Sequence, residues 1–158
     1  MDKLDFYKEL NQNLTGLIAG ETDPVANLAN ASALLFERMT EINWAGFYLM
    51  KAGELVLGPF QGKPACIRIA LGKGVCGTAA AERRTIVVPD VNQFPGHIVC
   101  DPDSQSEIVV PIISDGRVRG VLDIDSPILN RFDQADQNGL EQFVNILEAE
   151  IVWSEITD

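Results

Sequence analysis

The sequence is poor in the residues that most often build metal and phosphate sites. It contains one histidine, His97, and its three cysteines, Cys66, Cys76 and Cys100, include no Cys-x-x-Cys pair. A structural zinc site is therefore not expected. The glycine-rich segment 72–78 lacks the Gly-x-x-x-x-Gly-Lys-Ser/Thr spacing of a phosphate-binding loop. We predict that this segment instead forms a tight turn that brings the backbone at Cys76 close to another segment.

Positive charge and long apolar runs are also scarce. Twelve Lys and Arg face 23 Asp and Glu, and the net charge of −11 would repel both nucleic acid and an anionic membrane. No apolar run is long enough to cross a bilayer, and the charged first ten residues do not resemble a secretory signal. We therefore expect a cytoplasmic protein. In that compartment an odd number of cysteines indicates free thiols, metal ligands or redox chemistry rather than a structural disulfide framework.

What the sequence does contain is the apolar periodicity of an α+β fold. Its 158 residues, 46% of them hydrophobic, are expected to form a single domain over residues 1–158. The apolar terminal helices are compatible with a homodimer. We predict a central, mainly antiparallel sheet with the terminal helices on one face and a ligand pocket under loops on the other. The helices are predicted over 2–19, 25–39 and 133–155, with a short one within 71–81, and the strands over 43–50, 54–58, 66–70, 85–88, 107–113 and 120–125.

Two carboxylates interrupt the last predicted strand. Asp123 and Asp125 lie two residues apart, so both side chains lie on one face of the sheet. A buried carboxylate costs several kcal/mol unless a cation or hydrogen-bond donors meet it. We interpret the pair as the floor of a cation-binding pocket; the alternative is an exposed strand edge. Trp44 and Tyr48 share strand parity, and they either line an apolar-sided slot on this face or pack in the core.

Residues 89–105 form a long polar connection, which is typical of a functional loop. Cys100 lies in this loop, where its thiol would be accessible. Cys66 and Cys76 are either buried small hydrophobes or reactive thiols, and the residues themselves leave both alternatives open. Asp101 and Asp103 disfavour a thiolate at Cys100, so a low thiol pKa would need His97 or backbone donors to offset them.

Six segments taken together resemble the free methionine-(R)-sulfoxide reductases, which are enzymes with the GAF fold. The likeness runs from about residue 5 to residue 150. The segments are Asn-Trp-Ala-Gly-Phe-Tyr (43–48), Leu-Gly-Pro-Phe-Gln-Gly-Lys-Pro-Ala-Cys (57–66), Gly-Lys-Gly-Val-Cys-Gly-Thr-Ala (72–79), Gly-His-Ile-Val-Cys-Asp (96–101), Ser-Glu-Ile-Val-Val-Pro (106–111) and Gly-Val-Leu-Asp-Ile-Asp-Ser (120–126).

The resemblance implies a role for each cysteine. Cys100 would attack the sulfoxide sulfur and become a sulfenic acid as methionine leaves. Cys66 would resolve that acid as a disulfide, which thioredoxin would reduce, and Cys76 would be an auxiliary or alternative resolving thiol. The preference for the R sulfoxide and the absence of a bound cofactor also follow from the resemblance alone.

The resemblance further implies that Glu107, Asp123 and Asp125 line the substrate pocket and that Trp44 and Tyr48 enclose the methyl sulfoxide end. The charges agree with this, because the free amino acid carries an ammonium group that clustered carboxylates would bind. Protonation of the departing oxygen would require a raised pKa at Glu107 or Asp125. Two other functions remain as alternatives, namely a non-catalytic GAF module that binds a small ligand and a thiol-based redox sensor.

Overall fold

The sheet forms the centre of the molecule. The computed structural model describes residues 1–158 and contains one six-stranded sheet in the order β3-β2-β1-β6-β5-β4. Every pair of neighbouring strands is antiparallel. The strands are β1 (Trp44–Lys51), β2 (Glu54–Gly62), β3 (Arg68–Ala70), β4 (Ile86–Val88), β5 (Ser106–Ser114) and β6 (Arg117–Ser126).

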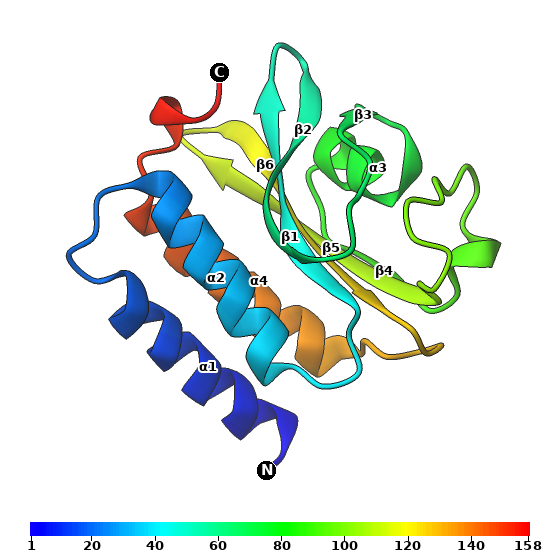
Figure 1. Ribbon diagram of the computed structural model, residues 1–158, viewed down its shortest axis with the longest axis horizontal. Helices are drawn as coiled ribbons and strands as arrows, with labels where there is room; N and C mark the ends of the chain where they lie inside the picture. Colours follow the sequence, from blue (N-terminus) through cyan, green and yellow to red (C-terminus); the bar gives the residue numbers. More distant parts are fainter.

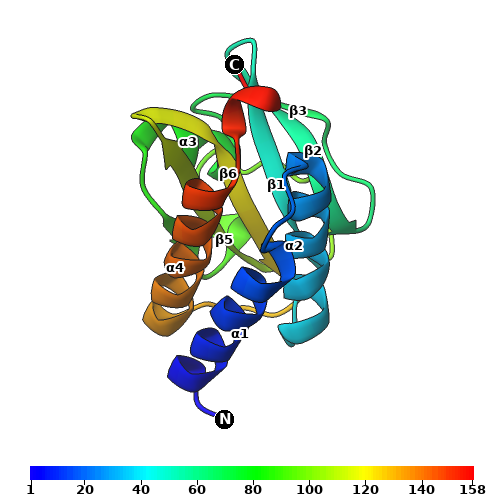
Figure 2. The same ribbon diagram turned by 90° about the vertical axis from the view of Figure 1, so that its left-hand side faces the viewer.

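The helices lie on both faces of this sheet. They are α1 (Lys3–Ile18), α2 (Pro24–Arg38), α3 (Gly74–Glu82) and α4 (Gln134–Glu150), with 3-10 turns η1 (Val91–Gln93) and η2 (Trp153–Glu155). Figures 1 and 2 show α1, α2 and α4 together on one face, while α3 and the loop before β5 lie on the other. This confirms the predicted α+β arrangement. None of the helices is long and apolar enough to cross a membrane.

The two faces of the sheet bury separate apolar clusters. Phe47 is fully buried in the cluster under α1, α2 and α4. Trp44 and Tyr48 belong to the cluster on the α3 side. The alternation along β1 thus places the two aromatic residues on the opposite face from Phe47, as their spacing predicts.

The structure corrects the predicted bounds of three segments. Cys76 lies in the first turn of α3 and not in the preceding glycine-rich turn, and Cys66 precedes β3, which begins only at Arg68. Helix α4 ends at Glu150 rather than at residue 155, because Ile151 adopts an extended conformation with ψ 137°. The chain then turns so that Trp153 is buried against the helix-side core.

The predicted close approach to another segment is made at Gly77, within the first turn of α3. A Cβ atom at Gly77 would lie 2.4 Å from the carbonyl oxygen of Ala70 at the end of β3. The Gly72 amide donates a hydrogen bond to the Gly77 carbonyl over 2.8 Å. Only glycine permits this contact, which fixes the start of α3 against the sheet.

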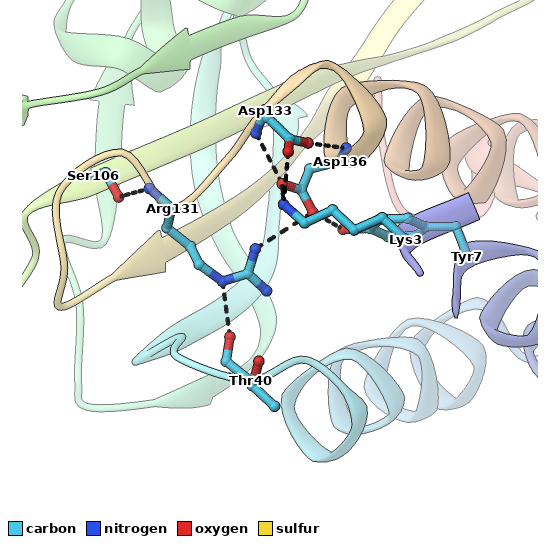
Figure 3. Close-up of polar contacts among 7 residues, drawn as sticks. All are labelled: Lys3, Tyr7, Thr40, Ser106, Arg131, Asp133 and Asp136. Atoms are coloured by element: carbon cyan, nitrogen blue, oxygen red, sulfur yellow. Dashed lines mark hydrogen bonds and ion pairs between the residues drawn. The ribbon is translucent and has the colours of Figure 1, made fainter. Parts of the chain in front are cut away.

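An ionic cluster centred on the buried carboxylate of Asp136 joins α1 to the start of α4 (Figure 3). The Asp136 carboxylate, 1% exposed, accepts hydrogen bonds from Tyr7 Oη at 2.7 Å and Lys3 Nζ at 2.6 Å. It also accepts one from the Asp133 amide at 2.8 Å and lies 3.4 Å from Arg131 Nη1. Asp133 and Asp136 form a capping box at this helix start.

Asp136→Asn should lower the free energy of unfolding by about 3 kcal/mol, because it leaves the cations of the cluster without their buried partner. Urea denaturation at neutral pH measures the change. Asp115→Asn is the matched control, since Asp115 lies in an exposed turn and its side chain is 89% exposed. The control should change stability by less than about 0.5 kcal/mol. Equal effects of the two substitutions would show that the cluster does not stabilise the fold.

Candidate active site

A small cavity on the α3 face collects most of the candidate site residues. Its volume is about 40 Å³, and α3, β1, β5, β6 and the loop before β5 all contribute to its walls. Cys66 is not among the wall residues and reaches the cavity only through its bond to Cys100. The candidate residues in the wall are Trp44, Tyr48, Cys76, Cys100, Glu107, Asp123 and Asp125.

Cys66 and Cys100 form a disulfide at this cavity. Their Cα atoms are 5.5 Å apart, within the range that a disulfide requires. The loops that carry them are also joined by an ion pair, in which Lys63 Nζ lies 2.5 Å from Asp103 Oδ2. The structure therefore shows the state in which the two thiols have already been oxidised.

Cys76 is the free thiol of the site. It is buried in α3, and its Sγ lies 4.0 Å from Glu107 Oε2. Burial, together with the charges of Asp123 and Glu107, raises the pKa of the Cys76 thiol well above its ordinary value. A protonated, buried thiol is a poor nucleophile, so in this state Cys76 is not suited to attack a substrate.

Three carboxyl groups come together on the centre of the sheet. Glu107 on β5 lies directly opposite Asp125 on β6, and Asp123 lies on the same face of β6. Burial, followed by the charge of Asp123, raises the pKa of Glu107 and of Asp125 well above the ordinary values. Burial also raises the pKa of Asp123, although contacts with Glu107 and Cys76 offset part of this rise.

One oxygen of this cluster has no partner. Asp123 Oδ1 is buried and makes no hydrogen bond. Burial lowers the pKa of the His97 imidazole, so His97 does not supply a positive charge that would neutralise the cluster. Its Nε2 lies 3.9 Å from Glu107 Oε1. A buried acceptor without a donor is destabilising. The cavity therefore favours a ligand that brings a positive charge or a hydrogen-bond donor.

Trp44 and Tyr48 have a positioning role that the sequence did not reveal. Tyr48 Oη donates a hydrogen bond to the Cys66 carbonyl at 2.9 Å, and Trp44 Nε1 donates one to the Lys63 carbonyl at 3.1 Å. The two rings are stacked with centroids 5.9 Å apart. The aromatic pair thus forms a wall of the cavity and also holds the segment that carries Cys66.

Asn43 is a second residue that sequence reasoning missed. Its Nδ2 donates to Asp101 Oδ2 at 3.0 Å and lies 3.1 Å from Ser104 Oγ. The other oxygen of Asp101 accepts the Asp103 amide at 2.9 Å. Both acidic neighbours of Cys100 are therefore engaged, Asp101 by these donors and Asp103 by Lys63, which reduces the negative potential that opposes a thiolate.

Comparison with known proteins agrees with this geometry. The GAF domain model matches residues 21–151. The chain is 55% identical to the free methionine-R-sulfoxide reductase of Escherichia coli, over 94% of this chain and 90% of the relative. It matches the reduced form of fRMsr of Staphylococcus aureus with a TM-score of 0.89 and 56% identity, over 91% of this chain and 94% of that one.

A further solved structure extends the match over nearly the whole chain. It is the free methionine-R-sulfoxide reductase of Neisseria meningitidis in complex with its substrate. The TM-score is 0.93 and the identity 48%, over 98% of this chain and 93% of that one. The protein belongs to the free methionine-R-sulfoxide reductase family of GAF-domain enzymes.

Proposed function

We propose that this protein reduces free methionine-R-sulfoxide to methionine, with Cys100 as the nucleophile, Cys66 as the resolving thiol and thioredoxin as the reductant. The observation that carries the proposal is the Cys66–Cys100 disulfide at a cavity lined by three carboxyl groups, of which Glu107 and Asp123 are buried. The substrate is supported by the relatives named for this activity, one of them in complex with its substrate.

The first step transfers oxygen from substrate to protein. The Cys100 thiolate attacks the sulfoxide sulfur, and the sulfoxide oxygen takes a proton from a neighbouring carboxyl group. The sulfur of the substrate gains two electrons and leaves as methionine, while Cys100 is oxidised to a sulfenic acid that holds the oxygen. Glu107 and Asp125 are suited to supply the proton, because burial and the charge of Asp123 raise their pKa values and so favour the protonated form.

The second step restores the protein. The Cys66 thiol attacks the sulfur of the sulfenic acid, water leaves, and the Cys66–Cys100 disulfide forms. Thioredoxin then reduces this disulfide by thiol–disulfide exchange, and its own two thiols are oxidised to a disulfide. The hydrogen bond from Tyr48 to the Cys66 carbonyl supports the geometry in which the two thiols meet.

The carboxyl cluster explains why the free amino acid would be preferred. The substrate ammonium supplies the donor that Asp123 Oδ1 lacks and the positive charge that the cluster requires. A methionine sulfoxide within a peptide has an amide in place of that ammonium. Specificity for the free amino acid then follows, because a peptide substrate would leave the buried carboxylates without a cationic partner.

The test is the consumption of substrate in molar excess. The purified protein with thioredoxin, its reductase and NADPH should convert many equivalents of L-methionine-R-sulfoxide to methionine and leave the S epimer. A sensor module would bind the sulfoxide without consuming it, and a redox sensor would stop after one equivalent. Either of these results would refute the proposed activity.

The loop that carries Cys100 should move during this cycle. In the oxidised protein the disulfide ties Cys100, a wall residue of the cavity, to Cys66, and the geometry that this bond requires need not suit attack on a substrate in the same cavity. Segment 96–104 should therefore be more exposed in the reduced protein, which must admit substrate. Hydrogen exchange of the reduced and the oxidised protein, compared peptide by peptide, measures this difference. Identical protection in both states would mean that the loop is fixed.

A further inference from the structure

Cys76 belongs to a cluster that the proposed reaction does not fully use. Its Sγ and one carboxylate oxygen from each of Glu107 and Asp123 lie within 4.8 Å of one another. The three residues come from α3, β5 and β6, and all three are buried. We propose that this cluster binds a thiophilic divalent cation of the Zn²⁺ or Cd²⁺ class, and that the bound cation excludes the substrate ammonium from the pocket.

The spacing of the three groups suits such an ion after a small contraction. With a Zn–S distance of about 2.3 Å and a Zn–O distance of about 2.1 Å, tetrahedral ligands of these types lie roughly 3.6 Å apart. The observed separation of Cys76 Sγ from Glu107 Oε2 is 4.0 Å. This pair reaches the required distance after a shift of a few tenths of an ångström, and the pairs that involve Asp123, which lie within 4.8 Å, must close by roughly one ångström at most.

A second observation points to a cation at this place. Asp123, a residue 6% exposed, is part of the cavity wall, and its buried Oδ1 has no hydrogen-bond partner. The fourth position can be filled by water or by His97, whose Nε2 lies 3.9 Å from Glu107 Oε1. The sulfur ligand selects the class of ion, because thiolates bind Zn²⁺ and Cd²⁺ well, whereas Mg²⁺ and Ca²⁺ require oxygen.

The sequence did not reveal this site, because its three ligands come from separate elements and lack the short spacing of zinc-binding motifs. Cys76 binds the ion as the thiolate and releases its proton to solvent. The ion and the ammonium need the same carboxylates, so each reduces the affinity of the other. This competition rests on the proposed function, whereas binding of the ion does not.

The oxidised protein allows a direct test. With the Cys66–Cys100 disulfide closed, Cys76 is the only thiol in the chain, so any cadmium–thiolate absorption in the ultraviolet reports Cys76. We expect one Cd²⁺ per chain. Cys76→Ser should lose the absorption, and Glu107→Gln should weaken the affinity roughly tenfold or more. Glu54→Gln is the control, since Glu54 is paired with Arg68 at the surface and is not a wall residue of the cavity, and it should bind as the unmodified protein does.

Two results overturn the site. The first is a folded, oxidised protein, checked by circular dichroism, that shows no cadmium–thiolate absorption. The second is an affinity that Glu107→Gln leaves unchanged, because Cys76 would then bind the metal without the carboxylates. The first result needs no variant, so the test stands even where a substitution impairs folding.

The competition is tested in the double variant Cys66→Ser, Cys100→Ser. Cys76 is then the only thiol, and no disulfide closes the loop. The apparent dissociation constant for Cd²⁺ should rise in proportion to the concentration of added methionine sulfoxide. Buffer of equal ionic strength without methionine sulfoxide is the control. Tight Cd²⁺ binding that the sulfoxide does not affect would refute the exclusion of substrate. An inactive native protein that still binds Cd²⁺ would instead refute the proposed function and leave the metal site intact.

Discussion

Cys100→Ser should abolish the reduction of methionine sulfoxide, with a loss of about a thousandfold or more, whereas Cys66→Ser should release one equivalent of methionine and then stop. In the proposed mechanism, a hydroxyl at position 100 replaces the thiolate that takes the oxygen, and a serine hydroxyl is a far weaker nucleophile. The resolving thiol acts only after methionine has left, so its loss blocks the second turnover and not the first.

Rapid quenching of a single turnover without reductant distinguishes these cases. Methionine is quantified by chromatography, and the protein is analysed by mass spectrometry for a sulfenic acid trapped with dimedone. Cys66→Ser should carry the adduct at Cys100, and Cys100→Ser should carry none. Turnover of Cys100→Ser with thioredoxin would show that another cysteine is the nucleophile, and sustained cycling of Cys66→Ser would assign resolution to Cys76.

Acetylation of the substrate amine should lower kcat/KM by about 10²-fold or more. The acetyl group removes the positive charge and leaves the buried carboxylate of Asp123 without its partner, a change on the order of several kcal/mol. Steady-state assays with free and N-acetyl L-methionine-R-sulfoxide measure the ratio at a pH near neutrality.

A substitution at Asp123 distinguishes recognition of the ammonium charge from a steric effect of the acetyl group. Asp123→Asn should reduce the rate with the free amino acid and affect the N-acetyl substrate far less, so the preference between them shrinks. Asp115→Asn, a change of the same chemistry in an exposed turn, should preserve the preference. If the preference were the same in Asp123→Asn as in the unmodified protein, the carboxyl cluster would not be the ammonium site.

The parts of the site that depend on strand alternation could be predicted from the sequence. Asp123 and Asp125 lie on the face of β6 opposite to Leu122 and Ile124, which are buried in the helix-side core. The period of two fixes this result once the segment is recognised as a strand. The turn composition of Ser114, Asp115 and Gly116 likewise predicts a hairpin between the strands on either side, and β5 and β6 pair in this way.

Contacts between distant segments could not be predicted in this way. Asn43 binds Asp101, which is 58 residues away, and no local pattern marks either side chain as the partner of the other. The end of α4 was also missed, since Ile151, Val152 and Trp153 continue the apolar pattern without a Gly or Pro stop signal. Burial of Trp153 in the core outweighs the helical periodicity there.

The 34-residue separation of Cys66 and Cys100 links catalysis to the stability of the whole chain. In the chain-entropy description, closing a loop of this length restricts the unfolded chain and adds about 3–4 kcal/mol to the free energy of unfolding. In the proposed cycle, oxidation by substrate would therefore strengthen the fold, and reduction by thioredoxin would weaken it again. The form that is ready to react is the one most easily denatured, so heat or denaturant will remove the reduced enzyme first.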